Sequence, residues 1–306
     1  MIRQVLIIAA VTALFSSGLL GAGDADLLAP GNIAAWCIVP FDASKRGPEA
    51  RAVMLQSLGI TKLAYDWREE HVPTFDAEIE AMQRHGIEIT AWWYPGHRQE
   101  VIDAIQRHGI HPQLWVCGVS RPGGGTVGDP QRIAVEAARI LPLAQEAAAV
   151  GCRIALYNHR EGWYEDQDNQ IAIIEHLRHD GVSNVGIVFN FHHFRGVLAD
   201  FATRFARMKP YLIALNLNGM PANTSVYPSV RFVGTDASEA AMLRVVVASG
   251  WNGPVGIIHE RPTMDAAEGL AKNLRGLDWL RKELGQPGSG GPQPSEHDAL
   301  NRPANP

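Results

Sequence analysis

The feature that most constrains the fold is a regular alternation between short apolar runs and longer segments with helical periodicity. From residue 33 to residue 284 this unit occurs eight times, at a spacing of about thirty residues. The apolar runs read as buried parallel strands, because such strands are covered on both faces. They are Ile33–Val39, Thr61–Tyr65, Ile87–Trp93, Gln113–Cys117, Arg153–Asn158, Val185–Phe191, Leu212–Leu217 and Val255–Ile258. Eight such units predict a single α/β domain, a closed (β/α)8 TIM barrel.

Each predicted strand is followed by a predicted helix, and the pair Asp129-Pro130 is a typical helix start. The helices are expected at residues 48–58, 74–85, 100–108, 130–150, 167–179, 198–208, 236–249 and 265–284. A further small strand is expected at Arg231–Val233. The alternative fold is an open doubly wound sheet, which would need a glycine-rich phosphate turn after the first strand. The link there, Pro40–Lys45, contains no glycine, so the closed barrel is favoured.

The two ends of the chain differ in composition from this repeating part. Residues 1–23 have one positive charge, then an apolar run from Val5 to Leu20, then small residues, which is the layout of a signal peptide. An uncleaved membrane anchor is the alternative, and both predict an exported protein, periplasmic or secreted. No other stretch is apolar and long enough to cross a membrane. The barrel is expected at residues 30–285, and residues 286–306, rich in Pro, Gly, Ser and Asn, are expected to be disordered.

The overall charge and the cysteine content exclude several classes of function. The net charge is −5, and no cluster of Lys and Arg suggests binding to a nucleic acid. The three cysteines, Cys37, Cys117 and Cys152, are widely spaced and lie in apolar runs. They are interpreted as small buried hydrophobic residues, not as a disulfide framework or a zinc ribbon.

Polar and aromatic residues gather where the predicted strands end. In a barrel of this kind active sites form at the carboxyl ends of the strands. Aromatic rings can cover the C–H face of a sugar while amides and carboxylates bind its hydroxyls. We therefore expect a small-molecule carbohydrate as partner. The candidate binding residues are Asp66, Trp67, Trp93, Tyr94, Asn158, Trp163, Asn190, Asn216 and Asn218.

Four of the twelve histidines also lie at predicted strand ends. Imidazole near neutral pH transfers protons or binds metals, although residues in such places also tie down loops. Strand alternation puts His192 on the face of Asn190 and His193 on the other, so both reach the rim only if the strand has ended. The candidate catalytic residues are His159, His193 and Glu260, and the candidate metal ligands are His159, His192, His193, His259 and Glu260.

These residues resemble the xylose isomerase-like TIM-barrel family, which holds many sugar phosphate isomerases and epimerases and the endonuclease-IV-type enzymes. The resemblance covers roughly Ile33 to Leu284. It is strongest in Ala155–His159 with Gly162-Trp163, in Asn169-Gln170 at the start of the next helix, and in Asn184–Val188.

The resemblance implies a divalent metal held by Glu, Asp, His and Glu from strands five to eight. This chain departs from that pattern, since Tyr157, Asn190 and Asn216 take the first three places and Glu260 the fourth. Of the family's two Glu bases only Glu260 remains, because Tyr157 is not a competent base near pH 7. Manganese prefers carboxylates, so a site built from the candidate histidines and Glu260 would suit zinc better.

The sequence predicts an exported sugar isomerase or epimerase, acting on a sugar or a keto-glycoside by proton transfer next to a carbonyl. The candidate cofactor is a divalent metal, zinc or manganese. Two alternatives stay open. One is a glycoside lyase or hydrolase on the same fold, and the other is a sugar-binding barrel that has lost its metal ligands and its catalysis. DNA-repair chemistry is disfavoured by the acidic charge and the leader.

Overall fold

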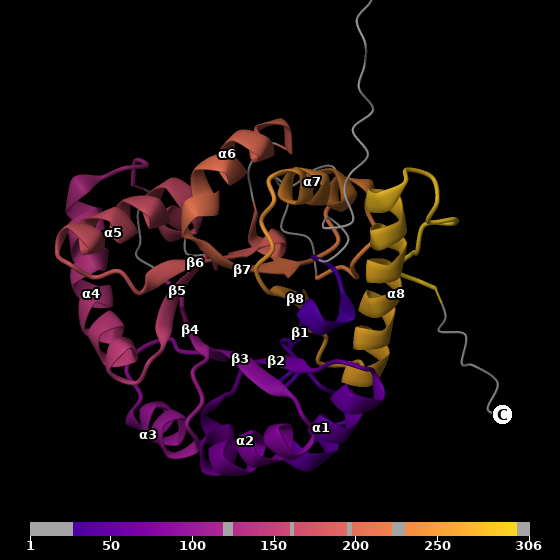
Figure 1. Ribbon diagram of the computed structural model, residues 1–306, viewed down its shortest axis with the longest axis horizontal. Helices are drawn as coiled ribbons and strands as arrows, with labels where there is room; N and C mark the ends of the chain where they lie inside the picture. Colours follow the sequence, from indigo (N-terminus) through magenta and orange to yellow (C-terminus); the bar gives the residue numbers. More distant parts are fainter. Residues whose placement is uncertain (1–26, 119–124, 160–161, 195–197, 222–229, 299–306) are drawn as a thin grey trace, which may run out of the picture.

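Eight parallel strands close into a barrel, in which each strand pairs with its neighbour in sequence and β8 pairs with β1 (Figure 1). The computed structural model describes residues 27–118, 125–159, 162–194, 198–221 and 230–298. The strands are β1 Ile33–Trp36, β2 Lys62–Tyr65, β3 Glu88–Trp93, β4 Gln113–Val116, β5 Arg153–Tyr157, β6 Val185–Asn190, β7 Leu212–Leu217 and β8 Val255–Ile258. This closure confirms the (β/α)8 barrel and excludes the open doubly wound sheet.

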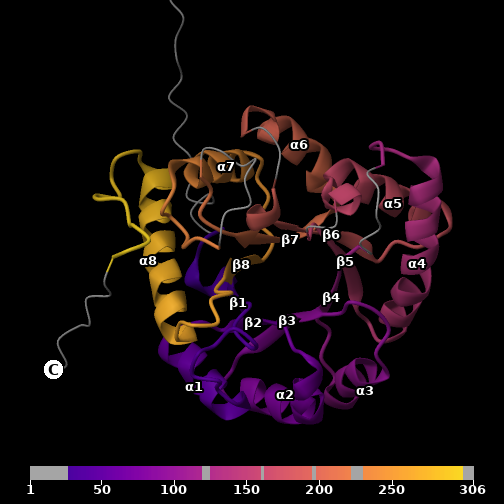
Figure 2. The same ribbon diagram turned by 180° about the vertical axis from the view of Figure 1, so that it is seen from behind.

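A ring of helices surrounds the barrel, as Figure 2 shows from the opposite side. The helices are α1 Pro48–Ser57, α2 Phe75–Arg84, α3 Gln99–His108, α4 Pro130–Ala149, α5 Gln167–His179, α6 Phe201–Met208, α7 Ala237–Ala248 and α8 Ala266–Gly285. The outward faces of the strands pack against these helices, and the inward faces form a second apolar cluster inside the barrel. Two apolar faces on each strand account for the continuous apolar runs in the sequence.

Four strands, β1, β4, β5 and β6, end earlier than expected, and the backbone shows why for β1 and β6. After β1, Cys37 adopts a left-handed φ of 57°, which cannot continue a strand. After β6, the side chain of Asn190 accepts a hydrogen bond from the backbone N–H of His192. This bond caps a short 3-10 turn, η5 (Phe191–His193), which replaces the end of the predicted strand.

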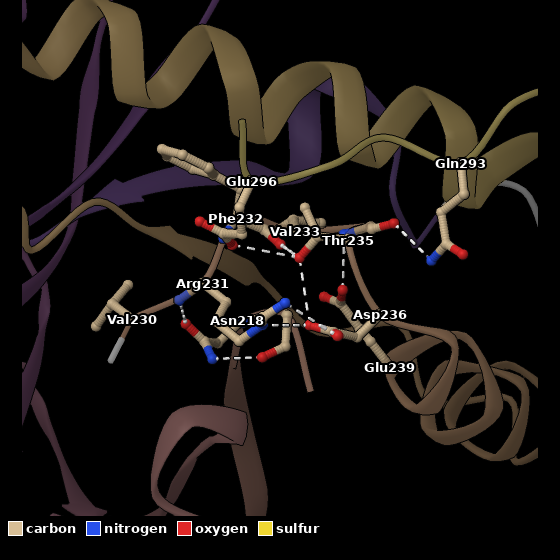
Figure 3. Close-up of polar contacts among 12 residues, drawn as sticks. Asn218, Val230, Arg231, Phe232, Val233, Thr235, Asp236, Glu239, Gln293 and Glu296 are labelled. Atoms are coloured by element: carbon tan, nitrogen blue, oxygen red, sulfur yellow. Dashed lines mark hydrogen bonds and ion pairs between the residues drawn. The ribbon is translucent and has the colours of Figure 1, made fainter. Parts of the chain in front are cut away.

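The small strand expected at Arg231–Val233 does not form. In this segment four successive backbone N–H groups donate to side chains instead of to a neighbouring strand. Figure 3 shows the segment together with three of the acceptors, Asn218, Glu239 and Glu296. The acceptors, in order from residue 231 to residue 234, are Asn218, Glu296, Asn273 and Glu239. The apolar residues Phe232 and Val233 suggested a strand, but no strand lies beside them among the residues described. The prediction was therefore wrong.

Residues 286–298, which we expected to be disordered, contain turns and bends and contact the barrel. Glu296 accepts hydrogen bonds from the backbone of Phe232 and from Arg261, both at 2.7 Å. Gln293 donates to the carbonyl of Gly234 at 3.0 Å (Figure 3). This segment has no large apolar residues, and charged and amide side chains make these contacts with the barrel instead. Residues 299–306 lie outside the described part of the chain.

The predicted signal peptide, residues 1–23, also lies outside the described residues. Within the described ranges no helix is both long and apolar enough to span a membrane. The three cysteines are free. Cys37 and Cys152 are buried as expected, whereas Cys117, which was also expected to be buried, is only partly buried.

Candidate functional site

A small cavity opens at the carboxyl ends of the strands, and we call it the central cavity. Its volume is about 60 Å³. It is lined by Trp36, Cys37, Phe41, Asp66, Arg68, Trp93, Tyr157, His159, His193 and Glu260. Five of these were candidates from sequence: Asp66, Trp93, His159, His193 and Glu260. The structure therefore brings together residues that follow five different strands.

The bottom of the central cavity is closed by four rings, which we call the aromatic floor: Trp36, Trp93, Trp115 and Tyr157. Trp115 stacks on Tyr157 with an angle of 12° between the ring planes, and Trp36 meets Trp115 edge-on at 4.7 Å between ring centroids. The Tyr157 hydroxyl accepts hydrogen bonds from Trp36 and from Asn190. Burial raises the pKa of Tyr157 well above its ordinary value. The phenol therefore stays protonated and serves as packing, not as a base.

Asp66 has an unusual carboxyl group for a residue beside an open cavity. It is only 1% exposed, and its Oδ1 accepts a hydrogen bond from the backbone N–H of Val39 at 3.2 Å. Its Oδ2 has no hydrogen-bond partner among the described residues. Burial raises the pKa of Asp66 to about 7, although the charge of Arg68 and the Val39 N–H oppose that rise. A carboxyl group that titrates near neutrality is suited to acid–base catalysis.

Glu260 lines the same cavity as Asp66 and lies in a strained stretch of backbone. Its φ is 37°, and Cys37 beside it has a φ of 57°. They are two of the three non-glycine residues with positive φ in the described chain. The Glu260 N–H donates to the Cys37 carbonyl at 3.1 Å, which fixes the two turns together. A strained backbone conformation persists only where the surrounding structure imposes it, and such residues cluster at functional sites.

Cys37 itself is not a candidate nucleophile. Burial raises the pKa of its thiol, and the nearby carboxylates of Asp66 and Glu260 raise it further. The thiolate is the reactive form of cysteine, and this environment disfavours it.

Two imidazoles, those of His159 and His193, also line the central cavity. The ring centroids of His159 and His193 lie 4.8 Å apart, and His193 meets the edge of Tyr157 at 5.6 Å. Because β6 ends at Asn190, His193 is free of the strand alternation and reaches the cavity. His192 packs its ring against His193 but does not line the cavity.

Three other candidates face away from the cavity because each is the chain neighbour of a residue that faces it. Trp67 donates to the Trp93 carbonyl at 2.7 Å and packs on Phe75 of α2. The Tyr94 hydroxyl bonds to Glu146 of α4, and burial raises its pKa.

The third of these, His259, lies against α8, where a side chain on Gly269 would collide with the imidazole. Burial lowers the pKa of His259, so the ring is neutral in this position. It lies outside the central cavity and apart from the other candidate ligands.

None of the four candidate asparagines lines the cavity, and three of them, Asn158, Asn190 and Asn218, hold the backbone at the rim. Asn158 bonds both backbone groups of Asn190, and Asn218 bonds the backbone of Arg231 and Gly219. Asn216 lies inside the barrel against Gly256. Neither atom of its amide has a hydrogen-bond partner among the described residues.

A larger cavity, which we call the side pocket, adjoins the central cavity. It measures about 330 Å³ and begins beyond the ends of β5 and β6. It is lined by Gly125, Val127, Gly162, Trp163, Glu165, Asp166, Gln167, Asn169, His193, Phe194 and Arg204. His193 lines both cavities. The candidate Trp163 belongs to the side pocket.

The residues present do not fit a divalent metal. In the described ranges no three His, Cys, Asp or Glu side chains lie close enough to hold one. The expected set is divided, since His259 faces α8 and His192 lies outside the cavity. The neutral residues Tyr157, Asn190 and Asn216 offer no carboxylate to a hard metal.

The sequence analysis missed five residues of the cavity: Trp36, Cys37, Phe41, Arg68 and Tyr157. The signal that could have found Trp36 and Tyr157 is their place at the end of a strand, in phase with Asp66 and Glu260. Arg68 lies two residues after Asp66, again on the same side. Cys37 and Phe41 line the cavity because of the turn that follows β1, and no sequence pattern predicts that turn.

Comparison with known proteins identifies the fold. No protein-family model matches the sequence, and no curated protein matches it either. Many solved structures do match. The IolI protein with a bound zinc atom shares 12% identity at a TM-score of 0.64, over 83% of this chain and 99% of that one. A D-allulose 3-epimerase from Methylomonas sp. shares 12% identity at a TM-score of 0.59, over 82% of this chain and 98% of that one.

A third match is a magnesium complex of a xylose isomerase-like TIM barrel protein from Mycobacterium smegmatis. It shares 12% identity at a TM-score of 0.56, over 84% of this chain and 97% of that one. These likenesses, together with the closed order of the eight strands, show that the chain has the fold of the xylose isomerase-like TIM-barrel proteins.

Proposed function

We propose that the chain is a carbohydrate enzyme of the isomerase or epimerase type, which moves a proton beside a carbonyl without a metal. One observation carries this proposal. The Asp66 carboxyl, with a pKa of about 7, lies at the same small cavity as Glu260 and two imidazoles. Sugar epimerases among the solved structures of this fold support the choice of substrate.

The reaction needs a base, a place for the resulting oxyanion and a route for the proton to return. The ionised Asp66 carboxylate takes a proton from the carbon beside the carbonyl. The C–H electron pair forms the double bond of an enediolate, and the carbonyl oxygen becomes an oxyanion. The guanidinium of Arg68 and the imidazoles of His159 and His193 supply positive charge or hydrogen bonds to that oxygen. Delivery of a proton by a protonated Glu260 to the opposite face of the same carbon gives the epimer, and the two carboxyl groups then regain their starting states by proton exchange with solvent. Transfer of the Asp66 proton to the former carbonyl carbon, while the proton of the neighbouring hydroxyl moves to the oxyanion, gives the isomer.

The proposal replaces the family's pair of bases with a different pair. The sequence keeps the carboxylate that follows β8, Glu260, but has Tyr157 where the family has the other. Asp66 follows β2 and restores a second carboxyl group to the cavity. Solved structures of the same fold hold zinc or magnesium. In the described part of this chain no three His, Cys, Asp or Glu side chains are grouped to hold such a metal, so no step here passes through one.

Glycoside cleavage is a second candidate, because two carboxyl groups line one cavity. Glycosidases use one protonated and one ionised carboxyl, and a pKa of about 7 would keep Asp66 protonated in mildly acidic solution. A sugar-binding barrel without catalysis is a third, and the loss of the metal-binding carboxylates favours it.

One experiment separates the three. The protein is treated with EDTA, dialysed, and incubated in D2O with free aldoses, ketoses and 3-keto-glycosides, and the products are followed by ¹H NMR. Deuterium appearing next to a carbonyl, lost in Asp66→Asn and kept in the surface variant Asp103→Asn, supports the proposal. Release of a reducing sugar without deuterium identifies cleavage, and binding without conversion identifies a sugar-binding protein. Absence of both binding and conversion contradicts a carbohydrate function.

We further propose that the protein is exported, because residues 1–23 have the layout of a signal peptide. N-terminal sequencing of the protein from a secreting host tests this. A mature start near residue 24 supports cleavage, whereas an intact Met1 in the cytoplasmic fraction contradicts export.

A further inference from the structure

We infer that the side pocket is a second sugar subsite, so that the substrate is a neutral glycoside with a ring on each side of His193. This inference rests on the proposed carbohydrate function and names the class of substrate. The first argument is size. The central cavity, at about 60 Å³, has room for a few water molecules or for the reacting end of a sugar. The side pocket, at about 330 Å³, reaches the size of ordinary ligand sites.

The two cavities share one lining residue, which belongs to the proposed catalytic site. His193 lines both, and its ring lies 4.8 Å from that of His159. In the inferred binding mode, a ligand that places its reacting carbon beside Asp66 extends past His193 into the side pocket. The linkage between the two parts of that ligand would lie close to the His193 imidazole.

The wall of the side pocket is held in place before any ligand arrives. Trp163 donates from its indole to the Thr126 carbonyl at 2.8 Å, and the Arg132 guanidinium lies 4.8 Å from its ring. The fully buried Asn169 accepts from Gly128 at 2.8 Å and donates to the Trp163 carbonyl at 2.6 Å. An aromatic ring fixed in this way offers an apolar surface at little entropic cost on binding.

The charged residues of the side pocket determine whether it accepts a neutral or an anionic sugar ring. Arg204 lies 3.5 Å from Asp166 and donates to Gln167 at 3.3 Å. With Glu165, the lining has two carboxylates against one guanidinium. The pocket therefore disfavours phosphate and uronate groups, since like charges repel. Carboxylates, an amide and a guanidinium beside a tryptophan are groups that bind the hydroxyls of a neutral sugar ring.

The test compares one-ring and two-ring probes by calorimetry. The probes are glucose, galactose, maltose, cellobiose, lactose and trehalose, with glucose 6-phosphate as the anionic probe. We expect at least one disaccharide to bind about tenfold more tightly than the monosaccharides. The variants Arg204→Met and Glu165→Gln should reduce this gain at least threefold and leave the affinity for the monosaccharides unchanged. The control Arg207→Met, in the same helix but paired with Asp168 outside the pocket, should keep the gain.

The outcomes separate this inference from the proposed function. Disaccharides that bind no more tightly than their components, or a gain that survives both pocket variants, would overturn the subsite while leaving the chemistry at Asp66 in place. A gain that depends on Arg204, in a protein that converts no sugar, would support the subsite and contradict the proposed enzyme. Tighter binding of glucose 6-phosphate than of glucose through Arg204 would overturn the preference for neutral rings. Absence of binding by every probe would also overturn the two-ring subsite.

Discussion

The central cavity and the side pocket share His193 but are built differently. The central cavity takes its side chains from strand ends or from the residues just after them, and the aromatic floor closes it below. The side pocket takes its side chains from the connections beyond β5 and β6 and from the helices that follow. Strand ends hold reacting groups rigidly, whereas connecting segments vary without disturbing the barrel. From this difference we assign catalysis to the central cavity and substrate recognition to the side pocket.

The largest effect is expected from Asp66→Asn, which removes the proposed base and keeps its shape. Turnover should fall by about 10²–10⁴-fold, the usual contribution of a positioned acid or base. Arg204→Met in the side pocket should leave the turnover of a one-ring substrate within a few-fold. Equal losses in both variants would remove the distinction between the two cavities. Steady-state kinetics on a converted sugar measures both.

The aromatic floor should contribute more stability than the wall of the side pocket. Trp115→Ala removes a buried ring in contact with two others and should cost about 3–5 kcal/mol in the free energy of unfolding. Trp163→Ala should cost less, because its ring borders an open pocket. Urea unfolding gives both values, and a larger loss for Trp163→Ala would reverse this order.

Stability should depend on pH through the central cavity. The folded pKa of Asp66, about 7, is raised above its ordinary value of 3.8. The folded state therefore binds the Asp66 proton more tightly than the unfolded state does. Its contribution is fully present below about pH 4 and is lost as pH rises to about 7. At about 1.4 kcal/mol for each pKa unit, the loss amounts to several kcal/mol.

Urea titrations of the wild type and of Asp66→Asn between pH 4 and pH 8 measure this loss as a difference. The variant should become more stable relative to the wild type as pH rises through this range. Parallel pH profiles for the two proteins would show that Asp66 has an ordinary pKa in the folded state.

The smallest effect is expected from Glu296→Gln, because it acts on the central cavity from outside. Glu296 holds Arg261, the neighbour of Glu260, and the backbone of Phe232. Loss of its charge should cost about 1–2 kcal/mol and speed hydrogen exchange at residues 230–234. The exposed Glu268→Gln on α8 serves as control. Turnover should decrease, and the preference between one-ring and two-ring sugars should stay the same. A changed preference would connect Glu296 to the side pocket instead.

The fold could be read from the sequence because buried parallel strands are apolar on both faces, and all eight runs became strands. The site could be read only in part. Asp66 and Glu260 were found, but their neighbours Trp67 and His259 were grouped with them although alternation turns these outward. The alternation of side chains holds only as far as the strand continues. A pattern of apolar residues does not predict the left-handed φ at Cys37 or the side-chain cap from Asn190, which end two of the strands.

The role of Asp66 could not be predicted for a different reason. Its pKa depends on burial, which is produced by residues from several loops that meet only in the folded barrel. The sequence suggested a residue that binds hydroxyls. The folded structure gives it the properties of an acid or base.

The central claim is that the fold holds one carboxyl group ready to exchange a proton near neutral pH. The most direct measurement is a ¹³C NMR titration of the aspartate side-chain carboxyls, in which Asp66→Asn assigns the Asp66 signal. The account predicts a midpoint near pH 7 for that signal in the metal-free protein. A midpoint near pH 4 would mean that Asp66 is an ordinary ionised carboxylate, and the proposed chemistry would lose its base.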